Sequence, residues 1–119
     1  FLFAHRMKEP KETIVLKAYD LLKTAIPMLN ELPRQYKFSL GDRLQNHLSD
    51  VLERLIEAVN LPPAEKKPVL RQVNLTLEKI RFYFRLGFDL GLYNSARYKF
   101  FTDKVDEIGH MTGGRLKSL

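Results

Sequence analysis

The sequence contains no cysteine, which rules out structural disulfides and thiolate metal sites. Its 3 histidines are widely separated, and none belongs to a His-Glu-x-x-His motif. No apolar run approaches the roughly 20 residues that a helix needs to cross a bilayer. We therefore predict a protein without metal, cofactor or membrane segment, and we expect it to act in the reducing cytoplasm.

Signatures of catalysis are missing as well. There is no Gly-x-Ser-x-Gly sequence for a nucleophilic serine and no glycine-rich phosphate loop after a strand. The carboxylates are scattered among lysines, as is usual on solvated helix faces. His47 falls beside an apolar stripe, which favours a half-buried structural histidine over a ligand. We predict that the protein has no catalytic residue and is not an enzyme.

Positive charge is concentrated in the second half of the chain. Residues 1–65 contain 9 lysines and arginines against 9 acidic residues, whereas residues 66–119 contain 11 against 5. The whole net charge of +6 therefore comes from the second half. An asymmetric basic surface indicates an anionic partner, most often nucleic acid. The alternative is that a small basic protein carries this charge without a specific partner.

Apolar residues recur at steps of three and four, and no stretch alternates with the period of a strand. Prolines and an Asn-Ser pair separate the periodic segments. This pattern predicts an all-α, antiparallel up-down-up-down four-helix bundle, with helices at residues 9–32, 39–60, 64–93 and 95–117. We expect residues 1–8 to be a disordered or vector-derived terminus and residues 9–119 to form the bundle.

Local signals predict the helix boundaries and some of the contacts. Ser39 and Ser95 are expected to cap the second and fourth helices, Ser39 together with Asp42 after a short connection at residues 34–38. Glycine pairs four residues apart are expensive in helices and indicate close helix crossings; they are Gly87 with Gly91 and Gly109 with Gly113. Aromatic residues at helical spacing are expected in the core, namely Phe82, Phe84, Phe88 and Phe101.

The remaining chemistry is a basic, aromatic-rich stretch in the third and fourth helices. Cations cluster around the sequence Arg81-Phe-Tyr-Phe-Arg85, where two guanidinium groups stand one turn apart. Clustered cations on a helix bind phosphates without reading sequence. Two alternatives stay open: Arg71 and Arg85 could pair with Glu78 on the same helix, or Arg81 and Arg85 could bridge to a neighbouring subunit.

A series of short motifs resembles a known family. In order, they are Leu32-Pro-Arg34, Phe38-Ser-Leu-Gly-Asp-Arg43, Leu55-Ile-Glu-Ala58, Leu77-Glu-Lys-Ile-Arg81 with Arg85-Leu86, and Glu107-Ile-Gly-His-Met-Thr-Gly-Gly114. The series resembles the accessory variability determinants of diversity-generating retroelements. It is also similar to the related bundles encoded in intervening sequences of 23S ribosomal RNA genes. One departure is Arg115, which stands where an aromatic residue, usually tryptophan, is expected.

The resemblance implies a basic helical bundle that assembles into a pentameric ring and has no activity of its own. Such a protein would bind the retroelement's reverse transcriptase and RNA or DNA, and would support mutagenic copying of template RNA. The binding residues it implies are Arg81 and Arg85, with nearby basic candidates at Arg71, Lys79, Arg97 and Lys99. The alternative is a protein of the ribosomal intervening-sequence type, with a structural or interaction role and no retroelement partner.

Overall fold

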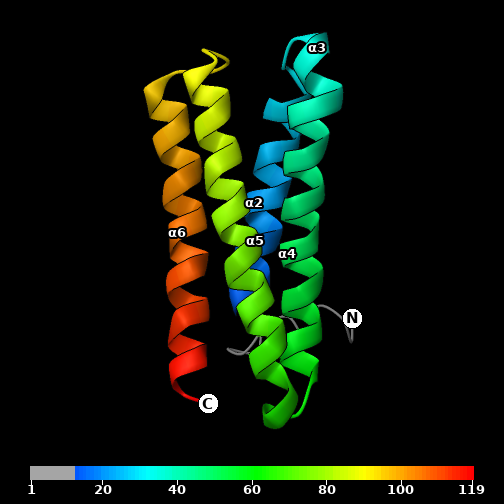
Figure 1. The fold of residues 1–119 in the computed structure, drawn as a ribbon, viewed down its shortest axis with the longest axis vertical. Coiled ribbons are helices and arrows are strands. Elements are labelled where there is room, and N and C mark those ends of the chain that lie inside the picture. Colours follow the sequence, from blue (N-terminus) through cyan, green and yellow to red (C-terminus); the bar gives the residue numbers. More distant parts are fainter. Residues whose placement is uncertain (1–12) are drawn as a thin grey trace.

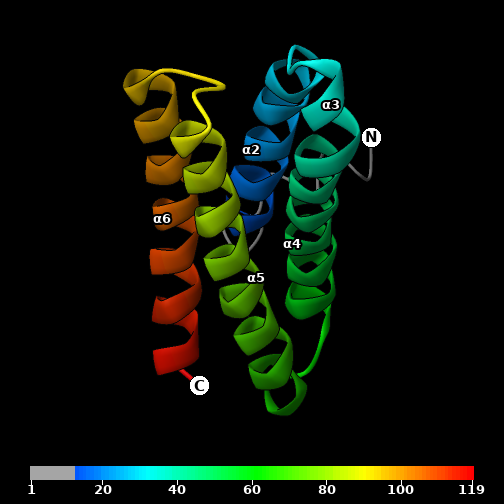
Figure 2. The same cartoon turned by 45° about the horizontal axis from the view of Figure 1, so that its top comes forward.

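The computed structural model describes residues 13–119 as an all-helical protein (Figure 1). Its helices are α2 (Thr13–Asn30), α3 (Arg34–Tyr36), the π-helical turn η2 (Lys37–Gly41), α4 (Asp42–Asn60), α5 (Pro63–Asp89) and α6 (Ser95–Lys117). The four long helices run alternately up and down, as Figure 1 and Figure 2 show. Each packs against two neighbours, in the cyclic order α2, α4, α5 and α6. The predicted antiparallel bundle is thus confirmed for the described residues, while the predicted terminus at residues 1–8 lies outside them.

The predicted apolar stripes form the core. Each long helix turns one face inward, and the periodic residues of that face are at most 7% exposed. They include Ile14, Leu21 and Met28 in α2, Leu44, Val51 and Leu55 in α4, Leu70, Leu77 and Ile80 in α5, and Val105 and Ile108 in α6. Burial of apolar surface stabilises such a bundle by about 25 cal/mol per Å². The core is therefore distributed along all four helices, and the outer faces remain for function.

The predicted connection at residues 34–38 is wrong. The chain is already helical at Arg34 and continues through α3, η2 and α4 to Asn60 without a break. The Ser39 cap is wrong for the same reason: the Ser39 hydroxyl donates to the Gln35 carbonyl inside this helix, 3.0 Å away. A π turn accommodates one additional residue within a helix. The sequence around Ser39 and Asp42 has the form of a helix cap, so the sequence alone does not distinguish this π turn from the start of a helix.

The end of α5 also differs from the prediction. The helix stops at Asp89, and Gly91 has a φ of 74°, which residues with a side chain rarely adopt. The Leu92 amide donates to the Gly87 carbonyl at 3.0 Å, and the Gly91 amide donates to the Phe88 carbonyl at 2.9 Å. This is a Schellman ending with Gly91 just past the helix. The predicted helix through residue 93 is therefore too long, and Gly91 does not mark a helix crossing.

The cap of α6 is shifted by one residue from the prediction. Asn94, not Ser95, precedes the helix, and its side-chain oxygen accepts a hydrogen bond from the Arg97 amide at 2.8 Å. Asn94 has an extended backbone, as an N-cap residue should. Because both residues are good caps, the sequence alone did not separate them. The end of the helix at Lys117 agrees with the prediction.

The aromatic predictions are partly confirmed. Phe84 and Phe101 are buried, and their rings stack with centroids 5.1 Å apart. Phe88 is half-buried and stacks on Tyr98. Phe82 is 68% exposed, so its assignment to the core is wrong. It lies on the opposite side of α5 from Phe84, because neighbours two apart on a helix face in very different directions.

Candidate nucleic-acid and partner interface

The predicted binding cations lie on the two adjacent helices α5 and α6. Arg71, Lys79, Arg81 and Arg85 belong to α5, whereas Arg97 and Lys99 belong to the first turns of α6. The structure shows that these side chains are not equivalent. Several already form an ion pair with a carboxylate of the same chain. A cation that is paired with a carboxylate binds a phosphate less strongly.

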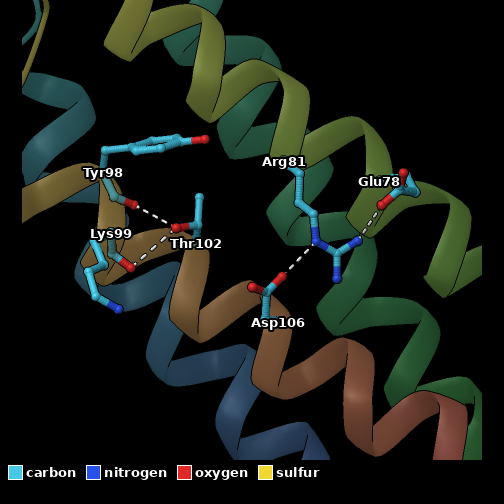
Figure 3. A network of polar contacts seen from close by, with 6 residues as sticks. All are labelled: Glu78, Arg81, Tyr98, Lys99, Thr102 and Asp106. Atoms are coloured by element: carbon cyan, nitrogen blue, oxygen red, sulfur yellow. Dashed lines mark hydrogen bonds and ion pairs between the residues drawn. The ribbon is translucent and has the colours of Figure 1, made fainter. Parts of the chain in front are cut away.

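Arg81 joins α5 to α6. Its Nη1 lies 2.6 Å from a carboxylate oxygen of Glu78, and its Nε lies 2.7 Å from one of Asp106 (Figure 3). Its side chain is only 32% exposed. Gly109 makes room for it, because a Cβ there would come within 2.8 Å of the Arg81 Nη2. The predicted close approach at Gly109 is thus an arginine crossing to the next helix, and nothing among residues 13–119 lies within 4 Å of a Cβ at Gly113.

The alternative pairing of Glu78 with Arg71 or Arg85 is wrong, since Glu78 holds Arg81. Arg85 instead lies 3.6 Å from Asp89, one turn later on the same helix. Its side chain is 66% exposed, so this pair is weak and solvent-screened. Arg85 remains accessible to a phosphate. Arg81 would have to give up its interhelical contact in order to bind one.

Arg97 and Lys99 are engaged more loosely. Arg97 lies 3.6 Å from Glu31, which follows α2. Lys99 donates to Asp103 at 2.8 Å, and this hydrogen bond raises the pKa of the lysine. The side chain of Lys99 is 75% exposed. Figure 3 places this lysine beside Thr102, whose hydroxyl donates to the Tyr98 and Lys99 carbonyls within α6.

Arg71 and Lys79 are the most available of the predicted residues. Both are exposed on α5, and within residues 13–119 no carboxylate lies at ion-pair distance from either. They are eight residues apart, so they lie roughly two turns from each other along the helix. An exposed helix surface with unneutralised cations can contact phosphates of an extended polyanion.

The histidines and carboxylates of the described residues are dispersed over the helices. Among residues 13–119, no group of three or more histidines and carboxylates could hold a metal ion. Glu107 and His110 stand one helical turn apart, but Glu107 pairs with Lys17 at 3.0 Å and His110 is exposed. No described helix combines the length and apolar character of a bilayer span.

Sequence reasoning missed a second basic and aromatic surface between α4 and α5. The rings of His47 and Tyr83 stack there with centroids 5.8 Å apart. Burial, followed by the charges of Lys79 and Arg43, lowers the pKa of His47. His47 is half-buried, as predicted. The only signal in the sequence was that His47 and Tyr83 occupy corresponding positions on the second and third predicted helices, which prove to be neighbours.

Comparison with known families decides where the chain belongs. The model of the bAvd-like family matches residues 13–119, which is the whole described bundle. The chain belongs to the bAvd-like family. This agrees with the resemblance to accessory variability determinants. No curated protein and no solved structure gives a significant match.

The motifs that carry the resemblance have structural roles in this bAvd-like chain. Phe38 to Arg43 spans the π turn and the start of α4, and Leu77 to Arg81 carries two buried residues of α5, Leu77 and Ile80, together with the interhelical arginine. Gly109, within the last motif, admits that arginine. Part of the family pattern is thus explained by packing, so a match to it does not by itself identify binding residues.

Proposed function

We propose that this protein is a non-enzymatic, cytoplasmic accessory protein of a diversity-generating retroelement. It holds the reverse transcriptase and its RNA or DNA together and so supports mutagenic reverse transcription. The observation that carries the proposal is the bAvd-like family match over residues 13–119. The net charge of +6, all of it from the second half of the chain, supports contact with a polyanion.

Self-assembly into a pentameric ring is part of the proposal. Large apolar side chains remain exposed on the outer faces, with Ile56 at 44%, Leu75 at 50% and Phe82 at 68%. Leu75 and Phe82 stand seven residues apart, on one face of α5, and an exposed apolar face commonly marks an interaction site. A closed ring would cover such side chains and would repeat the basic surface of α5 around an axis. Repetition raises the affinity for a long polyanion by avidity.

Arg71 and Arg85 are the best residues for testing nucleic-acid binding. Both are exposed on α5, and neither holds two helices together as Arg81 does. Reversing both charges, Arg71→Glu with Arg85→Glu, should weaken RNA binding and reduce its dependence on salt. For single-stranded RNA the slope of log K against log salt should fall by about 0.7 for each phosphate that the variant no longer neutralises.

The control changes the net charge by the same amount elsewhere. Lys23 is exposed on α2 and Arg54 lies on α4, both in the neutral half of the chain. The Lys23→Glu, Arg54→Glu double variant should keep most of the affinity and the original salt slope. Equal losses in the two double variants would mean that only net charge matters. Unchanged binding by the α5 variant would show that the proposed surface is not the nucleic-acid site.

The retroelement role has its own test. The purified protein should retain the reverse transcriptase encoded beside its gene, and the complex should copy template RNA with more errors than the polymerase alone. Absence of a neighbouring reverse transcriptase gene would instead favour the ribosomal intervening-sequence type.

A further inference from the structure

A groove at one end of the bundle is not explained by the basic surface of α5. Its lining residues come from α5 and from the continuous helix α3–η2–α4. These two helices diverge away from the tight turn that joins α4 to α5, as Figure 1 and Figure 2 show. The volume of the groove is about 340 Å³. The side chains that line it are mostly apolar or aromatic, namely Tyr36, Leu40, Tyr83, Leu86 and Leu90, with Ser39 and Arg43.

The α5 wall presents accessible aliphatic side chains. Leu86 is 44% exposed and Leu90 is 46% exposed, although both are large and apolar. Tyr83, one turn before Leu86, is half-buried, and its ring stacks on His47. Because His47 follows Arg43 by one turn of α4, the stack stands on the side of the groove toward the middle of the bundle. The two leucines are thus open to solvent at the end of a shaped depression.

The opposite wall comes from the start of the second long helix. Leu40, in the π turn, is 6% exposed and forms part of the floor. Tyr36 is half-buried and packs against the core. Arg43 is exposed and is the one charged residue among those lining the groove in the described chain.

The one charged side chain among the described residues that line the groove is positive, and Lys79 lies one turn before the lining residue Tyr83 on α5. Neither Arg43 nor Lys79 has a carboxylate at ion-pair distance within residues 13–119. Arg43 stands one turn before His47 on α4 and Lys79 one turn before Tyr83 on α5, so both cations lie close to the ring stack, and both lower the pKa of His47. Asp50 opposes them less strongly, and it also lies 3.7 Å from Arg54. The rim therefore suits a ligand that carries negative charge beside an apolar face.

We propose that this groove binds an amphipathic helix of a partner protein. Its aliphatic side chains would cover Leu86 and Leu90, and its flanking carboxylates would face Arg43 and Lys79. Amphipathic helices bind apolar grooves in this way through residues at i, i+3, i+4 and i+7. The inference rests on the proposed function only in naming the reverse transcriptase as the source of that helix.

Two other occupants fit the groove less well. Single-stranded nucleic acid binds by stacking bases on free aromatic faces, but Tyr83 is stacked on His47, Tyr36 packs against the core, and the open surface is leucine. A second copy that docked through this same groove would bring the Arg43 side chains of both chains together, because a two-fold contact uses the same surface on each partner. An acidic helix satisfies both the apolar surface and the charge.

The direct test uses a designed peptide. A labelled helix of about 20 residues, beyond the length at which isolated helices are marginal in water, carries leucines at i, i+3, i+4 and i+7 and glutamates on both flanks. Fluorescence anisotropy should show that it binds the wild-type protein. Leu86→Glu with Leu90→Glu should weaken binding about tenfold or more, as expected for anchor residues. Arg43→Glu should weaken binding and reduce its dependence on salt.

Tyr19→Glu is the control. Tyr19 is also a large exposed side chain, at 46%, but it lies on α2 and does not line the groove. This variant should bind the peptide like the wild type. A peptide that ignores the wild-type protein, or that loses affinity equally for the Tyr19 variant, overturns the proposal. The proposal is also overturned if the Leu86→Glu, Leu90→Glu variant loses RNA while it still binds the peptide, or if its only defect is a loss of self-association.

The reverse transcriptase supplies the second readout. If the groove is its docking site, the Leu86→Glu, Leu90→Glu variant should lose the polymerase while keeping RNA at low salt. Retention of the polymerase by this variant overturns the assignment. If the wild type binds the peptide but no reverse transcriptase, the proposed function fails while the groove remains a site for acidic helices.

Discussion

Arg81 illustrates how a single residue can be misread as a binding group. Its position in a basic cluster predicted contact with nucleic acid or a partner, but it lies between Glu78 and Asp106. We expect Arg81→Glu to lower the free energy of unfolding by about 1–3 kcal/mol, because it places three carboxylates together. Arg85→Glu, whose pair is exposed, should change it by less than about 0.5 kcal/mol. Urea denaturation measures both, and equal stabilities would show that the Arg81 contacts contribute nothing.

Replacing glycine by alanine should have opposite effects on stability at two positions, Gly87 and Gly113. A Cβ at Gly87 would lie 2.8 Å from the Tyr93 Cζ, and Tyr93 also donates to the Phe84 carbonyl. Gly87→Ala should therefore destabilise the protein, whereas Gly113→Ala should stabilise it by about 0.5–1 kcal/mol, since its surroundings are open and alanine favours a helix. Thermal unfolding of the two variants measures the difference. A neutral Gly87 variant would mean that Tyr93 moves aside at no cost.

His47 predicts a dependence of stability on pH. Its pKa in the folded protein lies below the ordinary value of 6.5, so the unfolded chain binds the proton more tightly. Stability should therefore fall as the pH is lowered through about 6.5 toward the folded-state pKa. His47→Gln should remove this part of the pH dependence. Unfolding measured between neutral and mildly acidic pH in the two proteins tests the effect, and identical profiles would contradict it.

At the scale of elements, the start of α6 depends on one side chain. Asn94 accepts a hydrogen bond from the Arg97 amide at 2.8 Å. Asn94→Ala should cost about 0.5–2 kcal/mol, the usual effect of losing an N-cap. Ser95→Ala should cost much less, because the Ser95 side chain does not make the cap. Chemical denaturation distinguishes the two, and a larger loss at Ser95 would restore the cap expected from the sequence.

The helical elements also shape the groove. Because the helix is unbroken from Arg34 to Asn60, the groove residues Tyr36 and Leu40 lie on a helix rather than on a loop. The Schellman ending at Gly91 fixes the chain direction immediately after Leu90, the last lining residue of the opposite wall. Both devices hold the rim of the groove in place.

For the whole molecule, assembly is the decisive property. Phe82 is 68% exposed on the outer face of α5, so Phe82→Glu should affect the isolated fold little. If a ring buries this face, the variant should shift from an assembly toward the 13.9 kDa single chain in light scattering. Lys23→Glu, on a different helix, should not. A wild-type protein that stays a single chain at all concentrations would contradict the proposed ring.

The sequence by itself determined the helical class, the inward face of each long helix and the sign of the surface charge. These follow from local periodicity and composition, as the buried positions of Leu44, Leu77 and Ile108 show. Only the tertiary structure decided which cations are already paired, because Asp106 approaches Arg81 from another helix. It also decided that Tyr36 and Leu90, far apart in the chain, line one groove. Pairing across helices depends on how the helices pack, and the periodic pattern of one helix does not show which helices pack against it.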